Sequence, residues 1–66
     1  MKIILNGNSI EIQNRLNVES LVISRGLKPS MIIAELNDEI VDSGNWTKII
    51  LKENDRIELI SFVSGG

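Results

Sequence analysis

The sequence opens with two segments in which apolar residues recur at every second position, within residues 3–5 and again within 10–12. Successive side chains of a β-strand point to opposite faces, so Ile3 and Leu5 share one apolar face, as Ile10 and Ile12 do, and Ile4 points the other way. The dipeptide Asn6-Gly7 separates the segments, and both residue types accept the positive φ angles of a tight hairpin turn. This pattern predicts a β-hairpin over residues 1–13.

Helical spacing replaces the two-residue alternation in the next segment. Val18, Leu21 and Val22 fall on one side of a helix and form its apolar stripe. Asn17 precedes the stripe and is a favoured N-cap residue. Gly26 follows it and accepts the left-handed conformation that commonly ends a helix. The pattern predicts one helix that starts after Asn17 and stops before Gly26.

Three further strands are predicted after the helix, over residues 31–36, 40–41 and 56–62. Between the last two, Trp46 is expected to open a short helical turn and to fill the core, because tryptophan has much apolar surface to bury. The element order is strand, strand, helix and then three strands. It predicts one α+β domain over residues 1–66, with a mixed sheet of four to five strands packed on one main helix, which fits the β-grasp arrangement.

Strand alternation also predicts apolar residues on the sheet face that the helix does not cover. If the central strands are neighbours, these residues form an exposed patch, and such patches commonly mark interaction sites. The alternative is that they are scattered surface hydrophobes, because the strand register is not known from the sequence. The predicted partner-binding patch consists of Ile4, Ile33, Ile60 and Phe62.

Composition argues against an enzyme that works alone. The 66 residues include no cysteine and no histidine. The chain therefore lacks a disulfide framework, a thiolate zinc site, the commonest protein nucleophile for acyl transfer and the usual general base. The acidic pairs Asp38-Glu39 and Glu53/Asp55 are expected to be solvated turns, since no metal-ligand pattern supports them. We expect no catalytic residues and no bound metal.

Charge and hydropathy limit the kinds of binding partner and the cellular compartment that we expect. The net charge is -2 and the seven basic residues are scattered, whereas nucleic-acid binding depends on clustered positive charge. No apolar run approaches the roughly 18 residues that span a bilayer, and the first residues lack a signal-peptide pattern. We expect a cytoplasmic protein that binds neither nucleic acid nor membrane.

The last residues, Gly65-Gly66, are the most informative chemical feature. A terminal carboxylate is ionised at neutral pH, and glycine has no Cβ, so this end can enter a channel too narrow for a side chain. With Val63 and Ser64 as further spacers, residues 63–66 reach about 13–14 Å as an expected flexible tail. Gly66 is the candidate reactive group. The alternative is an end that is merely frayed.

Several segments together resemble the sulfur carrier proteins of thiamine biosynthesis, the ThiS family. They are Leu36-Asn37-x-Glu39-Ile40-Val41, Trp46, Asn54-Asp55-Arg56-Ile57-Glu58 and Phe62-Val63-Ser64-Gly65-Gly66. The resemblance covers the whole chain and implies a ubiquitin-like β-grasp fold. One departure is Asp42-Ser43, where family members often carry a proline and a basic residue, which bears on partner preference.

The resemblance also implies a reaction sequence in which other proteins act on Gly66. A ThiF-like adenylyltransferase would use ATP to convert its carboxylate to an acyl-adenylate. A sulfur donor such as a cysteine desulfurase would supply the sulfur for a C-terminal thiocarboxylate, with Gly65 as the steric spacer. Thiazole synthase would take that sulfur to build the thiazole ring. The chain would bind no cofactor itself, since it has no glycine-rich phosphate loop.

Other functions remain open at this point. The small subunit of molybdopterin synthase shares the fold and the Gly-Gly end, although those chains are usually longer and often carry prolines in the tail, and Pro29 is the only proline here. A sulfur carrier of another pathway and a ubiquitin-like conjugating modifier use the same end group. A ubiquitin-like interaction module without tail chemistry is the alternative from a different class.

Overall fold

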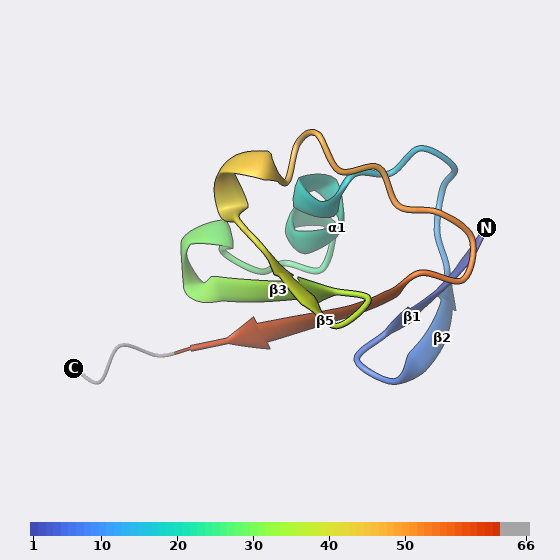
Figure 1. Cartoon of the computed structure of the whole chain (residues 1–66), viewed down its shortest axis with the longest axis horizontal. Helices are drawn as coiled ribbons and strands as arrows, with labels where there is room; N and C mark the ends of the chain where they lie inside the picture. Colours follow the sequence, from blue (N-terminus) through green and yellow to red (C-terminus); the bar gives the residue numbers. More distant parts are fainter. Residues whose placement is uncertain (63–66) are drawn as a thin grey trace.

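The computed structural model describes residues 1–62. Within them, one α-helix and two short 3₁₀ turns accompany five strands (Figure 1). The elements are β1 (Lys2–Leu5), β2 (Asn8–Glu11), α1 (Val18–Ser24), η1 (Pro29–Met31), β3 (Ile32–Leu36), β4 (Glu39–Val41), η2 (Ser43–Asn45) and β5 (Arg56–Ser61). This order confirms the predicted sequence of elements.

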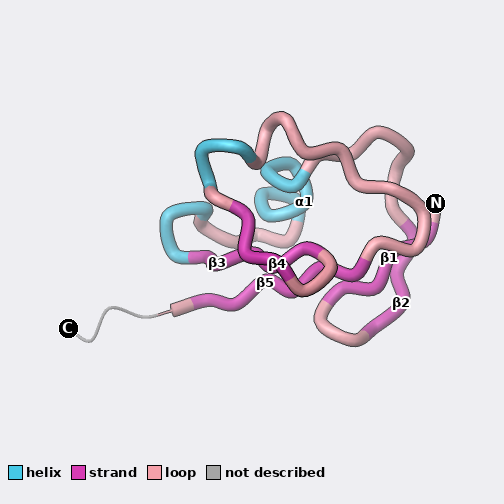
Figure 2. The backbone as a smooth tube through the Cα atoms, viewed as in Figure 1, coloured by secondary structure: helices cyan, strands magenta, loops and turns pink. Residues whose placement is uncertain are grey.

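The five strands form one mixed sheet in the order β2-β1-β5-β3-β4. The two strands farthest apart in sequence, β1 and β5, lie side by side and run parallel, while the other neighbouring pairs are antiparallel. Helix α1 and the loops that follow the edge strands β2 and β4 lie on one side of the sheet (Figure 2). The chain therefore has two layers, one helical and one sheet, in the β-grasp arrangement.

The predicted hairpin forms with the predicted turn. Asn6 and Gly7 have φ angles of 49° and 83°, and they join β1 to β2 so that Ile3 lies opposite Ile10. Positive φ at both central residues is the geometry of the turn that matches the right-handed twist of the two strands.

Both ends of α1 are set by the predicted residues. The Oδ1 atom of Asn17 accepts a hydrogen bond from the backbone N–H of Ser20 at 2.7 Å. At the other end, Gly26 has a φ of 75°, and its N–H donates to the carbonyl of Ile23 at 2.9 Å. A helix of seven residues is too short to be stable alone, so its apolar stripe must pack on the sheet to hold it.

The core lies between the helix and the sheet and follows the predicted alternation. Side chains of one parity along each central strand point toward α1, because successive residues of a strand face opposite sides. Leu36 has the core parity and packs against the core half-buried. The buried residues are Ile3, Leu5, Val18, Leu21, Val22, Ile32, Ala34, Trp46, Leu51, Ile57 and Leu59.

Trp46 fills the core as predicted, but the prediction that it opens a helical turn is wrong. The turn η2 precedes it, and Trp46 caps the end. The turn starts earlier because the Oδ2 atom of Asp42 accepts a hydrogen bond from the N–H of Gly44 at 3.1 Å and so caps the first residues. The indole Nε1 then donates to the carbonyl of Val41 at 3.1 Å, and the residue is 1% exposed.

Three strand ends also differ from the sequence prediction by one residue, and the first of them is the start of β4 at Glu39 instead of Ile40. Met31 belongs to η1 instead of β3, because Pro29 occupies the first position of that turn and favours it. At the other end of the pairing, β5 stops at Ser61, one residue before Phe62. None of these changes alters which side chains face the helix.

Candidate functional site

The predicted reactive tail, Val63 to Gly66, lies outside the described residues, so its role stays a prediction. The structure does describe the strand that leads to it. β5 lies between β1 and β3, and its buried residues Ile57 and Leu59 face the helix. Pairing continues to the end of the described chain, since the N–H of Phe62 donates to the carbonyl of Met31 at 3.0 Å.

The sheet face turned away from α1, which we call the outer face, has exposed apolar side chains next to the end of β5. Ile33 on β3 and Ile60 on β5 are direct cross-strand partners, and Phe62 follows two residues later with the same parity. These three residues, here called the apolar patch, are 39%, 44% and 44% exposed. Grouped exposed hydrophobes of this kind are typical of interaction surfaces.

Ile4, the fourth residue predicted for this patch, lies elsewhere on the outer face. It is half-buried and pairs with Arg56, four residues before Ile60 along β5. At about 3.3 Å per residue, that separates the two positions by roughly 13 Å. The structure therefore brings Ile33, Ile60 and Phe62 together and leaves Ile4 apart, because β1 meets only the first part of β5.

Ile40 is an exposed apolar residue of the outer face that the sequence prediction omitted. It lies opposite Glu35 in the pairing of β3 with β4, which makes it a diagonal neighbour of Ile33, and it is 71% exposed. The signal for it was present in the sequence. A two-residue turn at Asn37-Asp38 places Leu36 opposite Glu39 and so turns the next residue, Ile40, outward.

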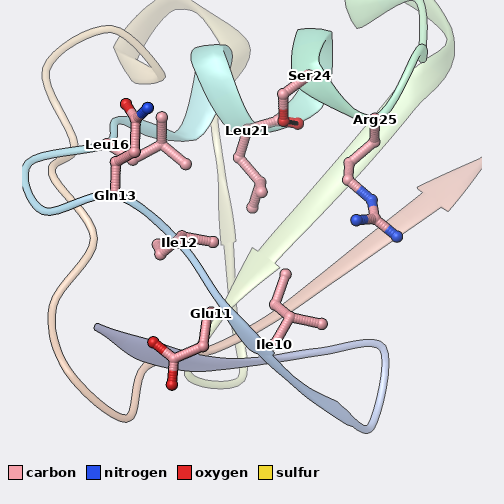
Figure 3. Close-up of a pocket in the computed structure, with 8 residues that line it drawn as sticks. All are labelled: Ile10, Glu11, Ile12, Gln13, Leu16, Leu21, Ser24 and Arg25. Carbon is pink, nitrogen blue, oxygen red and sulfur yellow. Dashed lines mark hydrogen bonds between the residues drawn. The ribbon is translucent and has the colours of Figure 1, made fainter.

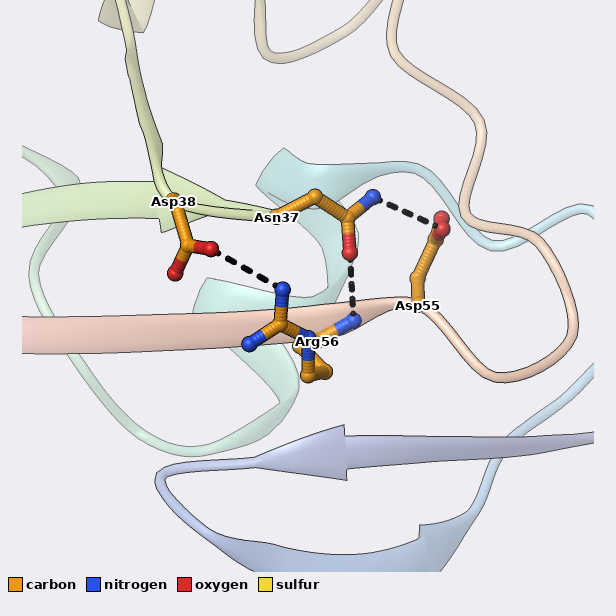
Figure 4. Close-up of polar contacts among 4 residues, drawn as sticks. All are labelled: Asn37, Asp38, Asp55 and Arg56. Carbon is orange, nitrogen blue, oxygen red and sulfur yellow. Dashed lines mark hydrogen bonds and ion pairs between the residues drawn. The ribbon is translucent and has the colours of Figure 1, made fainter.

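The other end of the outer face is polar and tied together by side chains (Figure 4). The Oδ1 atom of Asn37 accepts from the N–H of Arg56 at 3.0 Å, and its Nδ2 donates to Asp55 Oδ1 at 3.1 Å. The guanidinium of Arg56 donates to Asp38 Oδ2 at 3.0 Å. These contacts join the β3–β4 turn to the first residue of β5, so they hold the register of the strand that carries the patch.

A hollow of about 510 Å³ lies between β2 and α1, away from the end of β5 (Figure 3). Aliphatic side chains make up its floor, and Glu11 and Arg25 lie on different sides of it. β2 is an edge strand, and β1 separates it from β5. This hollow therefore does not adjoin the apolar patch. Its lining residues are Ile10, Glu11, Ile12, Gln13, Leu16, Leu21, Ser24 and Arg25.

Two kinds of feature are absent from residues 1–62. No three acidic, histidine or cysteine side chains come together in a way that could hold a metal ion. In the same part of the chain, no helix has the length and apolar character needed to cross a membrane. The candidate site that we consider below is the end of β5 with the exposed pair Ile33–Ile60 beside it.

Comparison with known proteins identifies the family of this chain. The sequence model of the ThiS family matches residues 3–66. A crystal structure of the thiamine biosynthesis protein ThiS from Geobacter metallireducens superposes with a TM-score of 0.86 and 25% identity, and each chain is covered completely. A solution structure of a thiamine biosynthesis protein from the same organism has a TM-score of 0.82 and 25% identity, and covers 100% of this chain and 88% of that one.

Relatives of known sequence include much longer proteins. A thiazole synthase of Magnetococcus marinus is 33% identical over 66 residues, which is all of this chain and 20% of that protein. An uncharacterized protein, ycf40, of Trieres chinensis is 32% identical over 94% of this chain and 85% of its own length. The chain thus spans about a fifth of the thiazole synthase and most of ycf40. With the ThiS model covering residues 3–66 and a ubiquitin-like β-grasp fold matching a ThiS structure, this chain belongs to the ThiS family.

Proposed function

We propose that this protein is a sulfur carrier whose Gly66 carboxylate is adenylated, converted to a thiocarboxylate and used as the sulfur source for thiazole formation in thiamine biosynthesis. The observation that carries the proposal is the match to the ThiS family, which extends through residue 66 and so includes the Gly65-Gly66 pair. The names of the structural neighbours, both thiamine biosynthesis proteins, support the same pathway.

The proposed chemistry needs only a carboxylate from this chain. A carboxylate oxygen of Gly66 attacks the α-phosphorus of ATP, and pyrophosphate leaves. Hydrosulfide then attacks the acyl carbon of the adenylate, and AMP leaves with the activated oxygen. The products are a thiocarboxylate, AMP and a proton. Adenylation is required because oxide is a poor leaving group and AMP is a good one.

The catalytic groups in this proposal belong to partner enzymes. A ThiF-like adenylyltransferase binds ATP and activates the tail, and a donor such as a cysteine desulfurase supplies the sulfur. Thiazole synthase accepts it. The described part of the chain contributes a docking surface, because the apolar patch of Ile33, Ile60 and Phe62 lies where β5 leads into the tail. A partner that covers this patch holds the tail close to its own active site.

Thiazole formation is favoured over molybdopterin synthesis by the relatives. In the proteins of Magnetococcus marinus and Paramagnetospirillum magneticum, a segment similar to this whole chain makes up 20% of a protein named thiazole synthase. A carrier domain and the enzyme that consumes its sulfur have a functional reason to share one chain, since the link raises their effective concentration.

Intact mass spectrometry tests the proposal directly. The protein is incubated with its cognate adenylyltransferase, ATP and sulfide, and a gain of about 16 Da is expected when sulfur replaces one oxygen. A reaction without ATP is the control. An unchanged mass with ATP would favour an interaction module without tail chemistry, and transfer of this chain onto other proteins would favour a conjugating modifier. Adding cognate thiazole synthase and its substrates should then return the mass to its original value.

A further inference from the structure

Two glutamates face each other across the centre of the outer face. Glu35 on β3 and Glu58 on β5 are direct cross-strand partners. Glu35 is half-buried and Glu58 is exposed. Like charges that lie directly opposite each other in a sheet destabilise it. We therefore expect this pairing of like charges to cost the free chain stability, on the same face as the apolar patch.

A hollow of about 170 Å³ lies beside this pair. Three carboxylates and one guanidinium line it, which leaves an excess of two negative charges. The guanidinium, on Arg56, is already bonded to Asp38 at 3.0 Å. Within residues 1–62, neither Glu35 nor Glu58 forms an ion pair. The residues of this acidic hollow are Ile4, Gly7, Glu35, Asp38, Arg56, Ile57 and Glu58.

The acidic hollow and the apolar patch are continuous. The pair Ile33–Ile60 and the pair Glu35–Glu58 occupy successive positions of the same parity along β3 and β5. A protein that covers the first pair therefore also covers the second. Covering carboxylates without a partner is costly because they lose their water. A basic side chain offsets that cost by forming charge-assisted hydrogen bonds with the carboxylates.

We propose, on the basis of the function proposed above, that thiazole synthase is the protein partner which covers the apolar patch. It places one basic side chain, an arginine or a lysine, in the acidic hollow. The cation lies between Glu35 and Glu58 and relieves their repulsion. The partner surface is therefore apolar over Ile33 and Ile60 and positive next to it. This charge fixes the direction in which the partner lies on the sheet, and hence the direction in which the tail enters its active site.

The free chain provides the first half of the test. In the double variant Glu35→Gln/Glu58→Gln the repulsion is gone, and in Glu58→Lys a favourable cross-strand ion pair replaces it. Both variants are expected to raise the thermal midpoint by about 1–5 °C. A lower midpoint in both variants would show that the two carboxylates are not in conflict in the free chain and would overturn the proposal.

Binding provides the second half, with purified cognate thiazole synthase as the partner and isothermal titration calorimetry as the measurement. Glu35→Gln/Glu58→Gln should weaken binding about tenfold at low salt and reduce its salt dependence, and Glu58→Lys should weaken it further. The matched control, Glu19→Gln/Glu39→Gln, removes the same charge from sites outside the hollow and should change binding less than about twofold.

The outcomes separate this inference from the proposed function. If both hollow variants bind as tightly as the unmodified protein while the 16 Da gain still occurs, the acidic hollow is not a docking element and the carrier function stands. If the unmodified protein gains no mass with active enzymes, the carrier function itself fails. If ultracentrifugation shows a dimer of this chain that the Glu35→Gln/Glu58→Gln variant loses, a second copy occupies the surface and the proposal is wrong.

Discussion

The side-chain amide of Asn6 forms the backbone hydrogen bonds to Leu59 that a neighbouring strand would otherwise form. Its Oδ1 atom accepts the backbone N–H of Leu59 at 2.8 Å, and its Nδ2 donates to the carbonyl of the same residue at 3.4 Å. Pairing between β1 and β5 has ended by this point, with Leu5 opposite Ile57. Backbone groups that lose a strand partner need another, so one turn residue secures β5 three residues before Phe62.

Replacing Asn6 with glycine should therefore destabilise the domain. Glycine accepts the φ of 49° found here. The loss of stability therefore measures the missing side-chain amide and not backbone strain. Two hydrogen bonds to a part-buried backbone predict a loss of about 1–3 kcal/mol in the free energy of unfolding, measured by urea denaturation. Asn8→Gly is the control, because Asn8 is exposed and makes no side-chain hydrogen bond in the described chain. Equal losses in the two variants would contradict the prediction.

Trp46 should be among the most sensitive positions for stability. It is 1% exposed and is bonded to Val41 through Nε1. Trp46→Ala is expected to cost about 3–5 kcal/mol through lost burial and the cavity that remains, which is much of the stability of a domain this small. Trp46→Phe keeps most of the ring packing and should cost clearly less. Thermal unfolding followed by circular dichroism would show two similar midpoints if the ring were not packed as described.

The tail should be chemically essential and structurally dispensable. Gly65→Trp adds a large side chain where the proposed function needs a narrow one, so the 16 Da gain should disappear while the urea midpoint stays at the original value. Gly65→Ala is the graded control and should react more slowly than glycine and faster than tryptophan. A stability loss as large as that of a core substitution would contradict the assignment of residues 63–66 as a tail.

The apolar patch should matter for binding and little for folding. Ile60→Thr keeps the β-branched shape that suits a strand and removes apolar surface. It should weaken binding of the cognate thiazole synthase about tenfold and change the free energy of unfolding by less than about 1 kcal/mol. Ile50→Thr is a matched control, since Ile50 is 46% exposed and Ile60 is 44% exposed. If the Ile50 variant weakens binding as much as the Ile60 variant, the patch is misplaced.

Most of the local structure could be predicted from the sequence because it depends on neighbouring residues alone. Asn6-Gly7 determined the hairpin, and Asn17 and Gly26 determined the two ends of α1. Strand alternation then placed the buried residues. Trp46 was predicted as core, but its place after η2 was not predicted. A hydrogen bond from Gly44 to the side chain of Asp42 makes the turn begin earlier in the chain, before Trp46.

The candidate site was only partly predictable for a physical reason. Alternation correctly placed Ile4, Ile33 and Ile60 on the outer face, but alternation does not say which of them are neighbours. Slipping one strand past another by two residues keeps every side chain on its face and changes every cross-strand partner. The parallel register of β1 with β5 is what separates Ile4 from the apolar patch.

The sequence by itself determined the class of fold, the order of the elements and the face to which each strand residue belongs, because these follow from spacing along the chain. Only the tertiary structure decided that Ile33 meets Ile60 and that Glu35 meets Glu58. Those contacts join residues more than 20 positions apart, and they depend on how all five strands pack on the helix together. The apolar patch and the acidic hollow next to it are therefore properties of the assembled sheet.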